Sequence, residues 1–112
     1  MRAPFQDVKR LAAMALANLA AYPSFQLTLV SEGVLSPVSD MLASGIPDIE
    51  LQAARCLAAL SQLDENKPRI AREVGVHNFI QLCRQRSAEH QICAATCLAN
   101  LSSVRGISAS WG

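Results

Sequence analysis

The sequence predicts an all-α fold built on a helical repeat of about 41 residues, a period typical of repeat proteins whose units are small groups of helices. The prediction rests first on three similar segments, AAMALANL at 12–19, AARCLAAL at 53–60 and AATCLANL at 94–101, which follow one another at the same interval each time. Chance similarity among Ala-rich helices would not keep one period twice. Composition is the second observation: 51% of the residues are hydrophobic but only 4% are aromatic, so the apolar content is mostly Ala and Leu. Side chains of this kind suit closely packed helices.

The first expected helix covers LAAMALANLAAY at 11–22, behind a short basic segment. A basic start, an apolar run and small residues are also what a secretory signal peptide needs. The same pattern recurs at 53–60 and 94–101, however, where no export signal could operate. The stretch is therefore interpreted as a helix of the mature fold.

The second long helix is expected to begin with Asp48 as its N-cap and to run to about Leu63. Pro47 breaks the chain just before it. Leu57 and Leu60 belong to an apolar stripe at helical spacing. This stripe predicts one buried face on the helix.

Two further helices are expected between the second and third copies of the repeated segment. Residues 64–66 open a short helix, with Pro68 in its first turn, where a missing N–H costs little. Gly75 ends the short helix, and another helix follows over about 78–85. Each unit therefore contains three helices of unequal length.

This order of helices is carried by the stretches ENKPRIAREVGV, NFIQLC and AATCLANLSS. It resembles the armadillo repeat family, including its vacuolar-armadillo and catenin-like members, in which a short helix ends at Gly and a long third helix follows a second one. The resemblance covers about residues 8–103, with Gly33 near the position of Gly75 one unit earlier. HEAT repeats have a similar period but two helices per unit, and the glycine and the Asn-Leu pattern disfavour them.

The resemblance implies a right-handed α-solenoid with about one complete three-helix repeat flanked by partial repeats. The armadillo segment would cover residues 1–103, as a partial repeat to about 19, a full repeat over about 20–63 and a partial repeat over about 64–103. Residues 104–112 are expected to form a disordered tail. Neither end resembles a polar cap, and the first helix would expose an Ala-rich face, so self-association through uncapped repeat ends is expected.

Candidate binding residues follow from the same resemblance. In armadillo proteins the third helices line a concave groove, where an Asn near the end of the helix hydrogen-bonds the backbone of an extended peptide. Asn18 and Asn100 match that Asn, whereas the middle unit has Ala59.

The groove departs from that of importin-alpha-like adaptors, which carry a Trp four residues before the Asn. The corresponding positions here are Met14, Arg55 and Thr96, so no Trp stacks on a Lys stem and Arg55 would repel a basic peptide. Arg55 is the only formal charge expected in the groove and would favour an acidic or phosphorylated group, or else it is a solvated helix residue. The predicted peptide-binding residues are Met14, Asn18, Gln52, Arg55, Thr96 and Asn100.

Other classes of site are disfavoured. His90, Cys93 and Cys97 share one helix face and could begin a zinc site, but no fourth ligand is evident and Cys97 repeats the position of Cys56, which indicates core packing. No nucleophile elbow, phosphate-binding loop or paired-carboxylate motif is present, so neither an enzyme nor a cofactor is expected.

Charge and hydropathy exclude further partners. The formal charge of +1 supplies no field for nucleic acid, and the longest apolar run is too short to cross a bilayer. The basic residues are interleaved with acidic ones and are expected on a solvated outer face; they are Lys67, Arg69, Arg72, Arg84 and Arg86.

The sequence thus predicts a non-enzymatic protein–protein interaction scaffold, located in the cytoplasm or nucleus, that binds an extended peptide or a partner helix. Two alternatives stay open at this point. The chain could be a truncated structural fragment or isoform of a longer armadillo protein without binding activity of its own, or an accessory segment of a multidomain enzyme.

Overall fold

The computed structural model describes residues 4–85 and 87–103. These residues form helices and turns, and none of them lies in a β-strand, which confirms the all-α prediction. Arg86 and the tail predicted for 104–112 lie outside the described residues. The elements in chain order are α1 (Pro4–Ala20), α2 (Pro23–Ser31), α3 (Leu35–Leu42), α4 (Pro47–Leu60), the 3₁₀ turn η1 (Asp64–Asn66), α5 (Lys67–Ile70), the π-helical stretch η2 (Ala71–Gly75), α6 (Val76–Cys83) and α7 (Ala88–Ser102).

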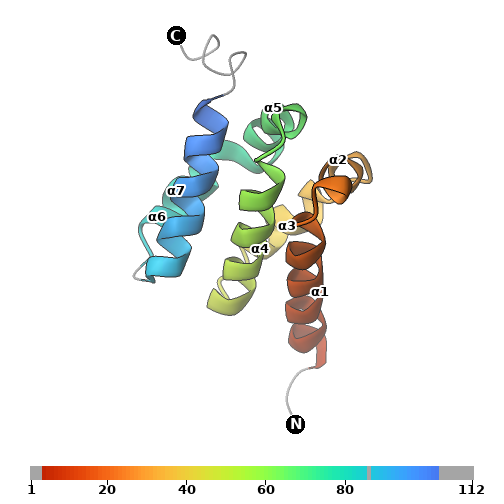
Figure 1. Ribbon diagram of the computed structural model, residues 1–112. Coiled ribbons are helices and arrows are strands. Elements are labelled where there is room, and N and C mark those ends of the chain that lie inside the picture. The colour runs from red at the N-terminus through yellow and green to blue at the C-terminus, as the bar shows by residue number, and fades with distance from the viewer. Residues whose placement is uncertain (1–3, 86, 104–112) are drawn as a thin grey trace.

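The three longest helices, α1, α4 and α7, lie side by side and run in the same direction (Figure 1). We call this arrangement the row. The central helix α4 packs against both of its neighbours, while α3 packs against α4 and α6 packs against α7 behind the row in this view. All three copies of the repeated sequence segment therefore occupy equivalent positions in one layer.

Helix α4 begins and ends slightly differently from the sequence prediction. Asp48 is not the N-cap, because Ile46 holds the extended N-cap conformation and Pro47 is the first helical residue. The φ of proline fits this position, and Asp48 instead places its carboxylate in the first turn, near the positive end of the helix. The helix ends at Leu60 rather than Leu63, because the backbone of Leu63 is extended.

The short helical stretch before α6 agrees with its prediction. Pro68 lies in the first turn of α5, and the stretch ends at Gly75. Gly75 has a φ of +90°, and Gly33 has a φ of +89°. L-residues with side chains rarely adopt this conformation, so both positions require glycine for the same reason.

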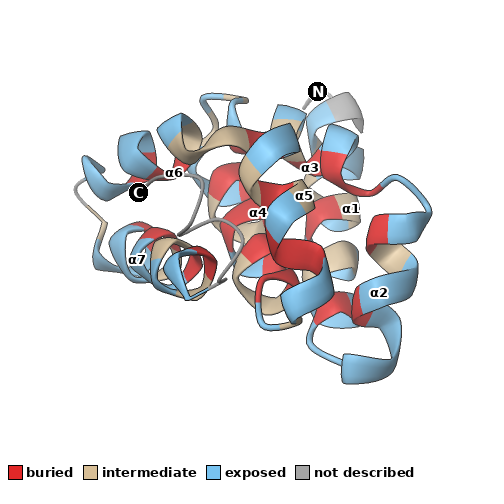
Figure 2. Ribbon diagram, turned by 90° about the horizontal axis from the view of Figure 1, so that it is seen from above, coloured by how far each residue is buried: buried red, intermediate tan, exposed pale blue. Residues whose placement is uncertain are grey.

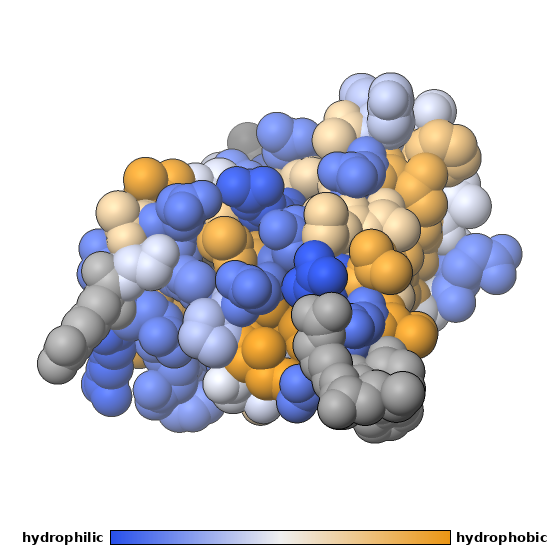
Figure 3. Space-filling model, turned by 90° about the horizontal axis from the view of Figure 1, so that it is seen from below, coloured by the Kyte–Doolittle hydropathy of each residue, from blue (hydrophilic) through white to orange (hydrophobic). Residues whose placement is uncertain are grey.

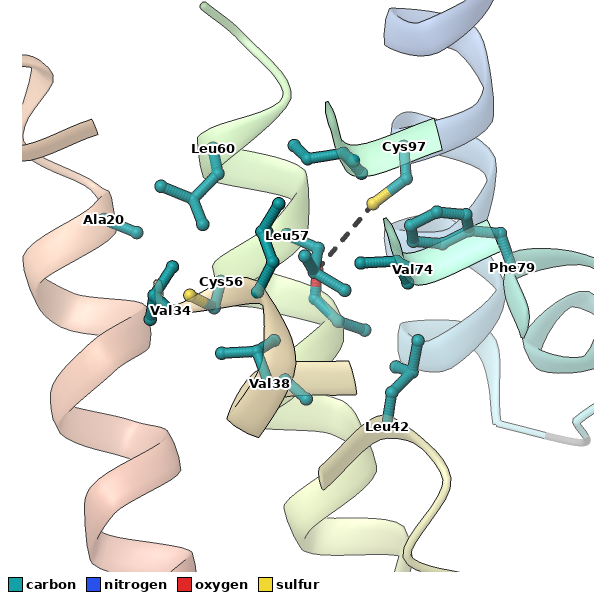
Figure 4. Close-up of a cluster of buried hydrophobic side chains, with 14 of the residues drawn as sticks. Ala20, Val34, Val38, Leu42, Cys56, Leu57, Leu60, Val74, Phe79 and Cys97 are labelled. Carbon is teal, nitrogen blue, oxygen red and sulfur yellow. Dashed lines mark hydrogen bonds between the residues drawn. The ribbon is translucent and has the colours of Figure 1, made fainter. Parts of the chain in front are cut away.

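The core lies between the row and the shorter helices and is centred on α4 (Figures 2 and 4). Cys56, Leu57 and Leu60 of α4 are fully buried, and Val38 and Phe79 from the shorter helices are fully buried against the same cluster. The apolar stripe predicted for this helix is therefore confirmed. Because α4 has a neighbour on each side, it contributes more of the core than α1 or α7.

Candidate functional site

The residues predicted to bind a peptide all lie on the row, two on each helix. Because the helices are parallel and the residues recur at the interval of the repeat, the equivalent side chains lie on one side of the layer. We call this side the row face, and its positions are Met14, Asn18, Arg55, Ala59, Thr96 and Asn100. Gln52 is half-buried beside it on α4.

The charge of Arg55 is compensated in the structure. Its Nη2 atom lies 3.2 Å from Oε2 of Glu89, in the first turn of α7, and both side chains are exposed. The prediction that Arg55 would be the only formal charge here is therefore wrong, because the packing of α4 on α7 brings a carboxylate beside it. An exposed ion pair contributes at most about 1 kcal/mol, so a ligand carboxylate or phosphate could compete with Glu89.

The two predicted asparagines have different surroundings. Asn100 is half-buried, and its Nδ2 donates to Oγ of Ser61 at 2.9 Å, which ties α7 to the end of α4. An amide has a second N–H and an acceptor oxygen, so this bond uses only part of its capacity. Asn18 is exposed on α1, and no described residue hydrogen-bonds its side chain. Asn100 therefore has a structural contact that Asn18 lacks.

Two further positions of the row face, Thr96 and Met14, are exposed but make local contacts. Thr96 Oγ1 donates to the carbonyl of Ile92 at 2.8 Å, one turn earlier in the same helix. Met14 Sδ lies 3.9 Å from Nη1 of Arg10 on α1. Together with the amides and the ion pair, these side chains make a mixed, mainly polar surface.

A second group of polar side chains, whose pairing was not predicted from the sequence, joins the C-terminal ends of the row helices to the shorter helices. Gln26 Nε2 donates to Ala20 O at 3.0 Å and to Gln62 Oε1 at 3.1 Å. Lys67 Nζ donates to Ser103 Oγ at 3.0 Å. The Gln26–Gln62 and Lys67–Ser103 pairs have the same sequence separation. Lys67 lies one full repeat after Gln26, and Ser103 lies one full repeat after Gln62. That recurrence is the signal that could have found them.

Lys67 is an exception among the basic residues. It was predicted on a solvated face, but it is buried, and its Nζ pairs with Oδ1 of Asp64 at 2.7 Å. Burial of an ammonium group requires such partners, and the Asp64 carboxylate and the Ser103 hydroxyl supply them. These contacts connect the start of α5 to η1 and to the residue that follows α7.

Asn66 is a fully buried polar side chain of this region. Its Nδ2 donates to the carbonyl oxygens of Gln26 at 3.0 Å and of Leu60 at 3.1 Å, so it links α2 to the end of α4. Its Oδ1 is buried and has no hydrogen-bond partner among the described residues. Asn66 thus secures the junction between neighbouring units.

The histidine and cysteines of α7 are packing residues in the structure. His90 is buried, and its Nε2 lies 2.9 Å from the carbonyl of Pro47. Burial raises the pKa of the Cys56 thiol to about 12 and also raises those of Cys93 and Cys97. No group of three or more metal-ligating side chains suited to a metal ion occurs within the described ranges.

The fold and the row face together define an all-α protein with a mainly polar surface across three parallel helices. Comparisons with protein-family models, with curated proteins and with solved structures give no match. Of the helices in the described part of the chain, none is both long enough and apolar enough to cross a membrane.

Proposed function

We propose that this chain is a non-enzymatic, armadillo-type interaction scaffold of the cytoplasm or nucleus, with the helices of the row as the third helices of successive repeats in a right-handed solenoid. Its ligand would be an extended peptide or a partner helix lying across the row face. The observation that carries the proposal is the parallel row itself, which puts side chains one repeat apart on the same exposed surface. A surface of this kind suits a ligand that crosses several helices.

The proposed mechanism uses backbone recognition. The Asn18 and Asn100 amides can each donate to and accept from a peptide backbone, which holds a strand without reading its sequence. Ala59 leaves a gap between them, so the middle of the ligand would be read by Arg55, with Gln52, Met14 and Thr96 tuning the choice. An acidic or phosphorylated side chain would displace Glu89 from Arg55, because charge-assisted bonds to phosphate are strong.

A peptide-array screen followed by titration of the best peptide tests the proposal. Asn18→Ala is the informative variant, because Asn18 is exposed and Asn100→Ala would also remove the bond to Ser61. Losing one net hydrogen bond should weaken binding about 2- to 10-fold with an unchanged melting temperature. Gln81→Ala, at an exposed position of α6, is the matched control and should bind like the wild type.

Two results would contradict the proposal. One is an array on which no peptide is retained by the folded protein, which would favour a purely structural segment. The other is an Asn18→Ala variant that binds as tightly as the Gln81→Ala control, which would place the ligand away from the row face.

A further inference from the structure

One side of α4 faces α1, and the equivalent side of α7 faces α4. On α1, the side equivalent to these two is exposed. On α4 the corresponding residues pack against α1: Ile49 is 1% exposed, and Sγ of Cys56 lies 3.7 Å from the carbonyl of Leu16. One repeat earlier, Val8 takes the position of Ile49 and is 63% exposed. We call the α1 side the leading face; its exposed members are Val8, Leu11, Ala15 and Leu19. Figure 3 shows hydrophobic residues gathered on the side of the molecule where α1 lies.

On α7 the exposed side is the other one, which on α4 faces the next helix of the row. Ala54 on the far side of α4 is fully buried by α7, and Sγ of Cys97 lies 3.9 Å from its carbonyl (dashed in Figure 4). One repeat later, Ala95 takes the position of Ala54 and is exposed. We call this α7 side the trailing face; its exposed members are Ile92, Ala95, Ala99 and Ser102.

We propose that the row continues from one molecule to the next, with the trailing face of α7 in one copy packed on the leading face of α1 in a second copy. The occupant is a second copy because the two faces are the one-repeat equivalents of faces that already pack together twice within the chain, α1 on α4 and α4 on α7. The new interface would therefore continue an existing one.

The side chains of the two faces suit this packing. The trailing face is made of small residues around Ala95 and Ala99, which let a neighbouring helix approach closely, as Ala54 does within the chain. The leading face supplies larger side chains, with Leu11 58% exposed. Their contact would remove from water the exposed apolar surface that soluble monomers rarely keep.

The proposed contact is head-to-tail, so each copy uses one face of each kind. Such a contact does not close on itself in a dimer, and the assembly grows with protein concentration. The contact uses the sides of the row and leaves the row face open, so it does not depend on peptide binding.

Two charge substitutions at exposed positions test the proposal by sedimentation velocity on the full chain. Leu11→Glu blocks the leading face, Ala95→Glu blocks the trailing face, and each variant alone should be monomeric at concentrations where the wild type forms larger species. A one-to-one mixture should form a heterodimer and nothing larger, because each variant keeps the face that the other has lost. Gln81→Glu, on α6, should associate like the wild type.

Each alternative gives a different pattern. A wild type that is monomeric at every concentration overturns the proposal, and so does a mixture of the two variants that stays monomeric. Association that survives Ala95→Glu but not Leu11→Glu would mean that two copies of α1 pack on each other, which also overturns it. Circular dichroism checks the fold of each variant, and Val8→Lys and Ile92→Lys replace any variant that does not fold.

Discussion

Replacement of Asn66 by Ala tests the link between neighbouring units. The side chain is fully buried and makes two hydrogen bonds, to Gln26 O and Leu60 O. Each bond contributes about 1 kcal/mol net, and the space left by the amide adds roughly 1 kcal/mol. The variant also removes the buried Oδ1 that has no partner, which offsets about 1 kcal/mol of the lost stability. We therefore expect Asn66→Ala to lower the free energy of unfolding by about 2 kcal/mol.

Urea unfolding followed by circular dichroism measures this loss. With a slope of about 1–2 kcal/mol per molar urea, the midpoint should fall by roughly 1–2 M. Asn78→Ala is the matched control, because Asn78 is half-buried and its Nδ2 donates only to Val74 O, one turn earlier, at 2.6 Å. The control should lose under about 1 kcal/mol. If Asn66→Ala lowers the free energy of unfolding no more than Asn78→Ala does, the link through Asn66 does not hold the units together.

Two further predictions concern Gly75 and the cysteines. Gly75→Ala should lower the free energy of unfolding by about 1–3 kcal/mol. The added Cβ meets open space, but the backbone keeps φ +90° and ψ 134°, a conformation that is strained for alanine. A loss below about 0.5 kcal/mol in the same urea titration would contradict this. Iodoacetamide should alkylate exposed Cys83 in the native protein and leave Cys56 unmodified until urea is added, because Cys56 is buried and its pKa is raised to about 12 by that burial. Peptide mass mapping distinguishes the two sites, and equal labelling of Cys83 and Cys56 would refute the burial.

Much of the helical architecture could be predicted from the sequence, because strong local signals mark it. Pro68 and Gly75 place the ends of the short stretch, and the recurrence of one apolar pattern at a fixed interval gives the row its three equivalent helices. The predicted start of α4 lies two residues too late, because Pro47 and Asp48 both favour a helix start and Pro47, rather than the residue after Asp48, is the first helical residue. Local signals alone do not decide which of two such adjacent residues begins the helix.

The contacts of the candidate site were less predictable, because they depend on how far neighbouring helices slide past each other. The repeat placed Arg55 and Asn100 on the row. It did not indicate that Glu89 would pair with Arg55 or that Ser61 would accept a hydrogen bond from Asn100. Lys67 looked like a solvated base for the same reason, since its partner Ser103 is far away in the sequence. A search for polar pairs that recur one repeat later would find the Lys67–Ser103 contact, because Gln26 and Gln62 form a pair one repeat earlier.

The side-by-side packing of the row also sets a length scale for ligands. Packed helices have axes about 8–10 Å apart, so Asn18 and Asn100, on the two outer helices, are separated by two such steps, roughly 16–20 Å. An extended peptide advances about 3.3 Å per residue, so a strand that reached both amides would need two anchor residues about five or six positions apart. Shorter peptides could engage only one amide, and the affinity of a truncation series should fall in a single step where that span is lost.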